Sequence, residues 1–123
     1  AALNAGFACR IPARRAGRRI ASVGDNRRTI LLELGGLPTP TQQADRIVTL
    51  LQRSLQQSIE ADRHYRDAFY GVTRPGCPIQ SNGDFGLAQA SDRRADAAKH
   101  RFLSVFNPLA ERFGRRTWAA ADI

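Results

Sequence analysis

The side chain best placed to do chemistry is Asp62. In a helix, at 100° per residue, it falls inside an apolar stripe between Leu55 and Phe69. A carboxylate in such a position needs a partner or acquires a raised pKa, because burial disfavours its charge. If a second predicted helix packs antiparallel to the first, Arg94 and Ser91 face Asp62. We therefore expect a buried or half-buried Asp62–Arg94 pair, or an Asp62–Ser91 hydrogen bond, that fixes the helix register. The alternative is a catalytic carboxylate in a cleft.

Two histidines each follow a carboxylate by four residues, as Glu60 precedes His64 and Asp96 precedes His100. Carboxylates and histidines on facing helices can bind a metal ion. Both histidines, however, fall on the side of their helix away from the apolar stripe, and the antiparallel pairing separates them by about 12 Å along the axis. The spacing therefore predicts contacts between neighbouring turns on each helix surface, and no metal site.

Cys9 and Cys77 are the two cysteines of the chain. Their separation lacks the short spacing of zinc ligands. In an oxidising compartment they could form a disulfide, which would stabilise the fold by about 4 kcal/mol for a loop of this length. In a reducing cytosol they would remain unrelated thiols. Both alternatives stay open, and so does the choice between a cytoplasmic and a secreted protein.

Other signatures of catalysis are missing from the sequence. It contains no GxSxG nucleophile motif, and its glycines lack the spacing of phosphate-binding loops. We therefore expect no cofactor, and a binding protein is favoured over an enzyme.

Positive charge is concentrated in the N-terminal third of the chain. Residues 1–33 carry seven arginines and two acidic residues, a balance of +5, whereas residues 34–123 carry twelve basic and nine acidic residues, a balance of +3. Such a segment attracts polyanions, and clustered arginines suit contacts with phosphates. The candidate anion-binding residues are Arg14, Arg15, Arg18, Arg19, Arg27 and Arg28. No helix-turn-helix, zinc-finger or RNA-binding signature accompanies them, so sequence-specific recognition is not expected. Aromatic residues are not interleaved with these arginines in the sequence, as binding of a single strand would require.

Two long amphipathic helices are predicted to position these residues, over about 40–70 and 86–106. Thr39 and Pro40 provide a capping residue and a favourable first position for the first helix. The second helix has small residues in the first half of its stripe, which permits close packing. Asn107 and Pro108 are expected to end it and to begin a short C-terminal helix that stops at Gly114.

The remaining segments complete one mainly α domain over residues 1–123, a usual length for a single core. Residues 1–17 are predicted to form a basic arm or irregular wrap. Two β-prone runs around Gly24, Asp25 and Asn26 favour a small β-hairpin over about 19–34. The two long helices should form an antiparallel hairpin, and no run of apolar residues is long enough to span a bilayer.

Three functional hypotheses follow. The first is a non-enzymatic helical binding or assembly protein whose basic N-terminal third contacts an acidic partner, with nucleic acid as the first candidate. The second is an extracytoplasmic helical protein stapled by Cys9 and Cys77 that acts through protein contacts. The third is a small enzyme that uses Asp62. A homo-oligomer formed through the helix stripes, such as the small residues of Ala88–Ala98, is a further expectation.

Overall fold

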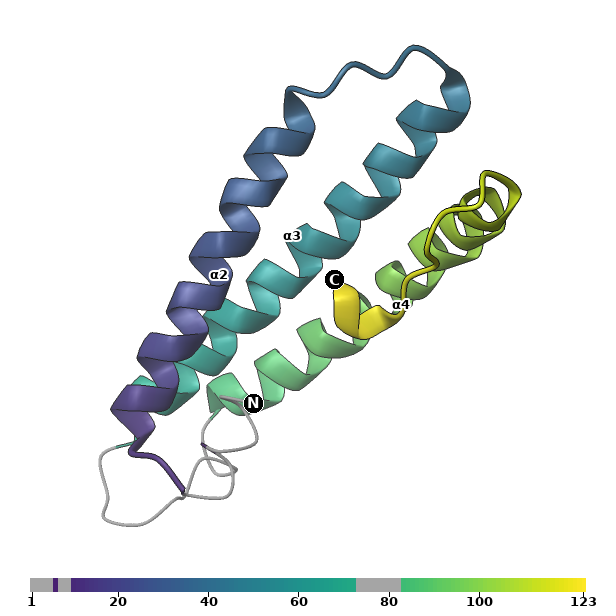
Figure 1. The fold of residues 1–123 in the computed structure, drawn as a ribbon. Coiled ribbons are helices and arrows are strands. Elements are labelled where there is room, and N and C mark those ends of the chain that lie inside the picture. The colour runs from purple at the N-terminus through teal and green to yellow at the C-terminus, as the bar shows by residue number, and fades with distance from the viewer. Residues whose placement is uncertain (1–5, 7–9, 73–82) are drawn as a thin grey trace.

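The computed structural model describes residues 6, 10–72 and 83–123 of the chain. Helix α2 (Ala13–Gly35), helix α3 (Gln42–Tyr70) and helix α4 (Gly83–Arg112) follow one another, and a 3₁₀ turn, η2 (Ala120–Asp122), lies near the C-terminus. Helix α3 is central: α2 packs along one side of it and α4 along another (Figure 1). Because α2 and α4 have few mutual contacts among the described residues, α3 takes part in both helix–helix interfaces.

The predicted antiparallel pair of long helices is confirmed by α3 and α4. Both faces of this interface contain small residues. Helix α3 contributes Ser54, Ser58 and Ala61, and α4 contributes Ala88, Ser91, Ala95 and Ala98, all of them buried. Small side chains let two helix backbones approach closely, so the Ala88–Ala98 stripe is used within the chain.

The predicted β-hairpin over 19–34 is wrong, because these residues belong to the 23-residue helix α2. The buried positions Ala16, Ile20 and Gly24 recur every four residues, which is a helical period and places one stripe against α3. Asp25, expected in a turn, instead accepts a hydrogen bond from Arg28 one helical turn later at 2.7 Å. The β-propensity of isoleucine, valine and threonine is weak, and packing against α3 overrides it. Residues 13–17, assigned to an irregular arm, are the first turns of the same helix.

Helix α3 begins two residues later than its sequence suggests. Its N-cap is Thr41, whose hydroxyl accepts a hydrogen bond from the Ala44 amide at 3.1 Å. Thr39 lies outside the helix and donates to Asp45. The predicted end is confirmed, since the helix stops at Tyr70 and Gly71 follows as its C-cap.

Helix α4 continues through Asn107 and Pro108, so the predicted break and separate short helix are wrong. The Asn107 side chain does not cap a helix. Its amide donates to the carbonyl of Trp118 and its oxygen accepts from the Trp118 amide, both at 2.9 Å. These bonds hold the segment after α4 against the helix, where the Trp118 ring packs on Phe102 and Phe106. The predicted stop at Gly114 is confirmed, and its φ of 62° lies in the left-handed region that glycine favours.

None of the helices in the described part of the chain combines the length and apolar character needed to cross a bilayer.

Candidate nucleic-acid interface

Four arginines share the outer surface of the first two turns of α2: Arg14, Arg15, Arg18 and Arg19. All four are exposed, and they lie on the side of α2 opposite the buried stripe. Spacings of one, three, four and five residues bring them onto one broad helix face over about 7.5 Å of axis. We call this set the α2 arginine face. Among the described residues, no carboxylate forms an ion pair with any of them.

The position of the α2 arginine face is unfavourable for the helix itself. The N-terminal end of a helix carries a partial positive charge, so cations there are destabilising and acidic residues are favoured. The first turn of α2 has no acidic residue, and its N-cap, Pro12, has no capping side chain. The four arginines therefore do not serve the local stability of α2, which leaves their charge available to a partner.

Additional arginines line the seam between α2 and α3 on one side of the helix pair. A shallow hollow there is bordered by Arg28 of α2 and by Arg63 and Arg66 of α3. Two of these arginines have acidic neighbours, because Arg28 binds Asp25 and Arg66 binds Asp67 at 2.8 Å. Arg63 is exposed and has no ion pair among the described residues. The seam thus extends the positive surface, although more weakly than the α2 arginine face.

Arg27, although adjacent to Arg28 in sequence, points about 100° away from it around α2. Its guanidinium donates to Asp62 at 2.5 Å, and the two side chains are only 20% and 11% exposed. The partner of Asp62 is therefore Arg27 of α2 and not Arg94 of α4. Sequence reasoning missed this pair because the expected β-hairpin gave α2 no helical face to pack on α3.

Arg94 lies at the outer edge of the α3–α4 contact and does not reach Asp62. It is exposed and donates to Gln57 at 3.3 Å and to the Ser91 hydroxyl at 2.9 Å. Its closest carboxylate is that of Glu60, at 3.8 Å. Arg94 therefore tethers the outer edge of the α3–α4 contact and has no role in neutralising Asp62.

The Arg27–Asp62 pair belongs to a half-buried polar cluster that also contains Tyr65, Asp92 and Lys99. Burial raises the pKa of Asp62, and Arg27 opposes that rise by hydrogen bonding and charge. Burial likewise lowers the pKa of Lys99. Tyr65 donates to Asp92 at 3.2 Å, and burial, together with that carboxylate, raises the pKa of Tyr65 to about 12.

The groups of this cluster form a structural network between the helices. Asp62 is 8% exposed and its charge is matched by Arg27, so a solvent-borne substrate has little access to it. Such a paired carboxylate favours a role in helix register over a role in catalysis.

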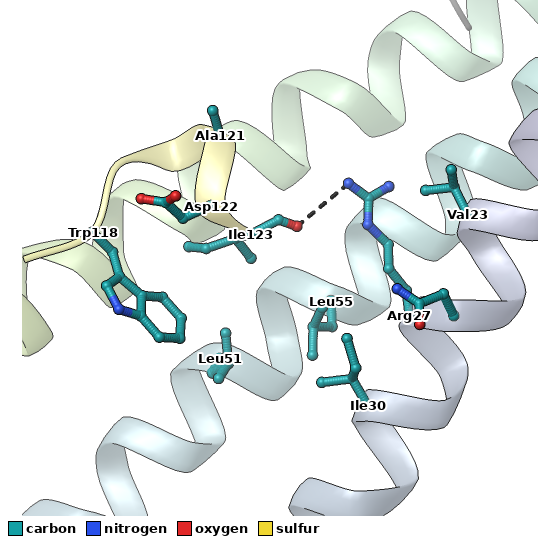
Figure 2. A pocket seen from close by; sticks show the side chains of 10 residues that line it. Val23, Arg27, Ile30, Leu51, Leu55, Trp118, Ala121, Asp122 and Ile123 are labelled. Atoms are coloured by element: carbon teal, nitrogen blue, oxygen red, sulfur yellow. Dashed lines mark hydrogen bonds between the residues drawn. The ribbon is translucent and has the colours of Figure 1, made fainter. Parts of the chain in front are cut away.

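A second hollow, of about 310 Å³, adjoins Arg27 and is formed by α2, α3 and the segment after α4 (Figure 2). Its walls are mainly apolar, with Val23, Ile30 and Leu51 among them. Arg27 donates a long hydrogen bond, 3.4 Å, to the Ile123 carbonyl across this hollow. Arg27 and Asp122 are the charged residues that line it.

The remaining sequence candidates are distributed as follows. His64 lies 3.9 Å from Glu60, which confirms the expected contact between neighbouring helical turns. His100 is exposed on α4. The described residues contain no cluster of three or more potential metal ligands. Cys9 and Cys77 lie outside the described residues, and so does any bond between them.

Tyr70 is the surface residue that sequence reasoning left aside. Its side chain lies beside Arg14 and Arg18 at a hollow of about 330 Å³. The packing of α2 on α3 brings these three residues together. Their proximity can therefore be inferred only when residues 13–35 are recognised as a helix.

Comparison of the chain with protein-family models, with curated proteins and with solved structures found no significant match.

Proposed function

We propose that this chain is a non-enzymatic helical binding protein that contacts the phosphates of nucleic acid through the α2 arginine face. The observation that supports the proposal most strongly is the group of four adjacent, exposed arginines without ion pairs among the described residues. Arginine is the side chain best suited to bidentate contact with phosphate oxygens. Contacts of this kind position a protein on nucleic acid and carry no sequence information.

The placement of charge gives the proposal a second support. The arginines stand at a helix end where they weaken the helix, each by about 0.3–1 kcal/mol when exposed. Their replacement by alanine, the best helix former, is therefore expected to leave the free energy of unfolding unchanged or slightly increased. Loss of binding in such a variant would then not result from loss of the fold.

The test compares two quadruple variants by fluorescence anisotropy with a labelled oligonucleotide of mixed sequence. One replaces the α2 arginine face with alanine. The control replaces Arg46, Arg53, Arg101 and Arg115, which are also exposed and lack ion pairs among the described residues. Both variants lose four positive charges.

We expect the first variant to lose most of its affinity and the control variant to lose far less. Equal losses would show that net charge, and not the α2 arginine face, determines binding. Absence of measurable binding by the unaltered chain at low salt would refute the proposal.

A further inference from the structure

The ring of Tyr70 has a fixed place on the surface of α2. Cδ1, Cε1 and Cζ of the ring lie so close to Gly17 that a Cβ atom at this position would overlap them. Gly17 is buried within α2, and its lack of a side chain creates the space for the ring. The contact therefore holds one side of the Tyr70 ring against α2, while the residue as a whole remains 44% exposed.

The side of this ring that faces away from Gly17 is the one a ligand could use. In the described part of the chain, Tyr65 contacts Phe85, and Phe102, Phe106 and Trp118 contact one another, whereas none of these rings packs on Tyr70. In the same part of the chain, Arg112 lies over the ring of Phe113. A partly exposed aromatic ring that is held on one side is a suitable platform for another flat ring.

Positive charge flanks the platform. Arg14 and Arg18 lie three residues before and one residue after Gly17, and both line the hollow of about 330 Å³ beside Tyr70. This volume is at the lower end of the usual range for small-molecule pockets, about 300–1,000 Å³. The nearest acidic residue on the same turn of α3, Asp67, is bound by Arg66 through two hydrogen bonds of 2.8 and 3.0 Å.

We infer that the nucleic acid bound by this surface is single-stranded, with one unpaired base stacked on Tyr70 and the adjacent phosphates on Arg14 and Arg18. The inference rests on the proposed function and specifies its substrate class. Aromatic side chains combined with arginines are the usual means of holding single strands, because every base has a π-face. In a duplex the base faces are covered by their neighbours, so a surface ring cannot stack on them.

The experiment measures affinities for three probes at one salt concentration: a thymidine oligonucleotide, a duplex of mixed sequence and inorganic polyphosphate. Tyr70→Leu removes the aromatic ring and keeps an apolar side chain of moderate size. Tyr70→Phe is its matched control, because it preserves stacking. Circular dichroism and polyphosphate binding report whether each variant keeps the fold and the arginine surface.

We expect Tyr70→Leu to weaken binding of the single strand by about 5- to 150-fold, the usual effect of losing one stacked base. Polyphosphate binding should stay within about twofold, since phosphate contacts do not involve the ring. Tyr70→Phe should retain the affinity for the single strand, and the unaltered chain should prefer the single strand to the duplex.

Two results would overturn the inference. They are an unchanged affinity of Tyr70→Leu for the single strand and a duplex affinity equal to that for the single strand. If the unaltered chain still binds polyphosphate in that case, only the stacking inference fails. If it binds none of the three probes, the proposed function fails with it.

Discussion

At the scale of single residues, the pairing of Arg27 with Asp62 separates structural charge from surface charge. The two arginines at positions 27 and 28 are neighbours in sequence, yet one is half-buried on a carboxylate and the other lies at the exposed seam. Adjacent helical residues point about 100° apart, so a charge count along the sequence cannot distinguish them. The buried stripe of α2 does distinguish the two arginines, because Arg27 lies on the side of the helix that the stripe occupies.

Replacement of Arg27 by alanine should destabilise the fold by about 3 kcal/mol, because it leaves the Asp62 carboxylate buried without its partner. Arg94→Ala is the matched control, since it removes the arginine that the sequence predicted as the partner. Its side chain is exposed, so a change within about 0.5 kcal/mol is expected. Chemical denaturation measures both values, and a larger loss for Arg94→Ala would contradict the pairing.

The raised pKa of Tyr65 predicts a loss of stability in alkali. Between pH 10, where an unfolded tyrosine ionises, and its folded pKa of about 12, the native state keeps a proton that the unfolded chain has lost. The free energy of unfolding should therefore fall as the pH rises through this window. The lowered pKa of Lys99 acts in the opposite direction, but only below its ordinary value of 10.5.

Tyr65→Phe is the variant that isolates this effect. It loses the hydrogen bond to Asp92, at a cost of about 1 kcal/mol near neutral pH. Between pH 10.5 and 12 its stability should fall less than that of the unaltered chain. If the free energy of unfolding fell by the same amount in both proteins between pH 10.5 and 12, Tyr65 would not be the source of the loss of stability.

At the scale of elements, helices α3 and α4 were predictable from the sequence, and α2 was not. Thr41, Gly71 and Gly114 act near the expected boundaries, because capping chemistry is local in sequence. Helix α2 was missed because a glycine between β-prone runs also resembles a hairpin turn. The four-residue spacing of Ala16, Ile20 and Gly24 is a helical period. It can be recognised as a buried helix face only when the packing partner, α3, is known.

Gly24→Ala tests the helical state of this segment. A Cβ atom at Gly24 would lie 3.7 Å from the Asp62 Cβ, an ordinary contact, so alanine fits without displacement. The variant should be more stable by about 1 kcal/mol, the difference in helix propensity between glycine and alanine. In a hairpin turn that required glycine, the same change would be destabilising.

Gly114→Ala is the corresponding control, for which we expect a loss of stability instead of a gain. Gly114 has a φ of 62°, where a side chain is strained, so alanine should cost about 1–2 kcal/mol. Thermal unfolding of the two variants side by side would establish both signs. A destabilised Gly24→Ala would argue against the helix over Ala13–Gly35.

At the scale of the whole molecule, charge and packing occupy different surfaces. Helix α3 contacts both neighbours, and the polar cluster with Arg27 and Asp62 is half-buried. The exposed α2 arginine face belongs to the first turns of α2, which lie beside the C-terminal end of α3 (Figure 1). The sequence predicted the four arginines of this face but not their neighbour Tyr70. That proximity depends on the register of α2 against α3, which no local pattern encodes.

The central claim is that the α2 arginine face binds phosphates, and the salt dependence of binding tests it most directly. Each neutralised phosphate contributes about 0.7 to the slope of log K against log salt for a single strand. Replacing the whole face with alanine should therefore lower the slope by about 3, measured by anisotropy between about 50 and 200 mM salt. The exposed-arginine control variant should keep most of the slope of the unaltered chain. An equal slope for the unaltered chain and the α2 variant would contradict the account.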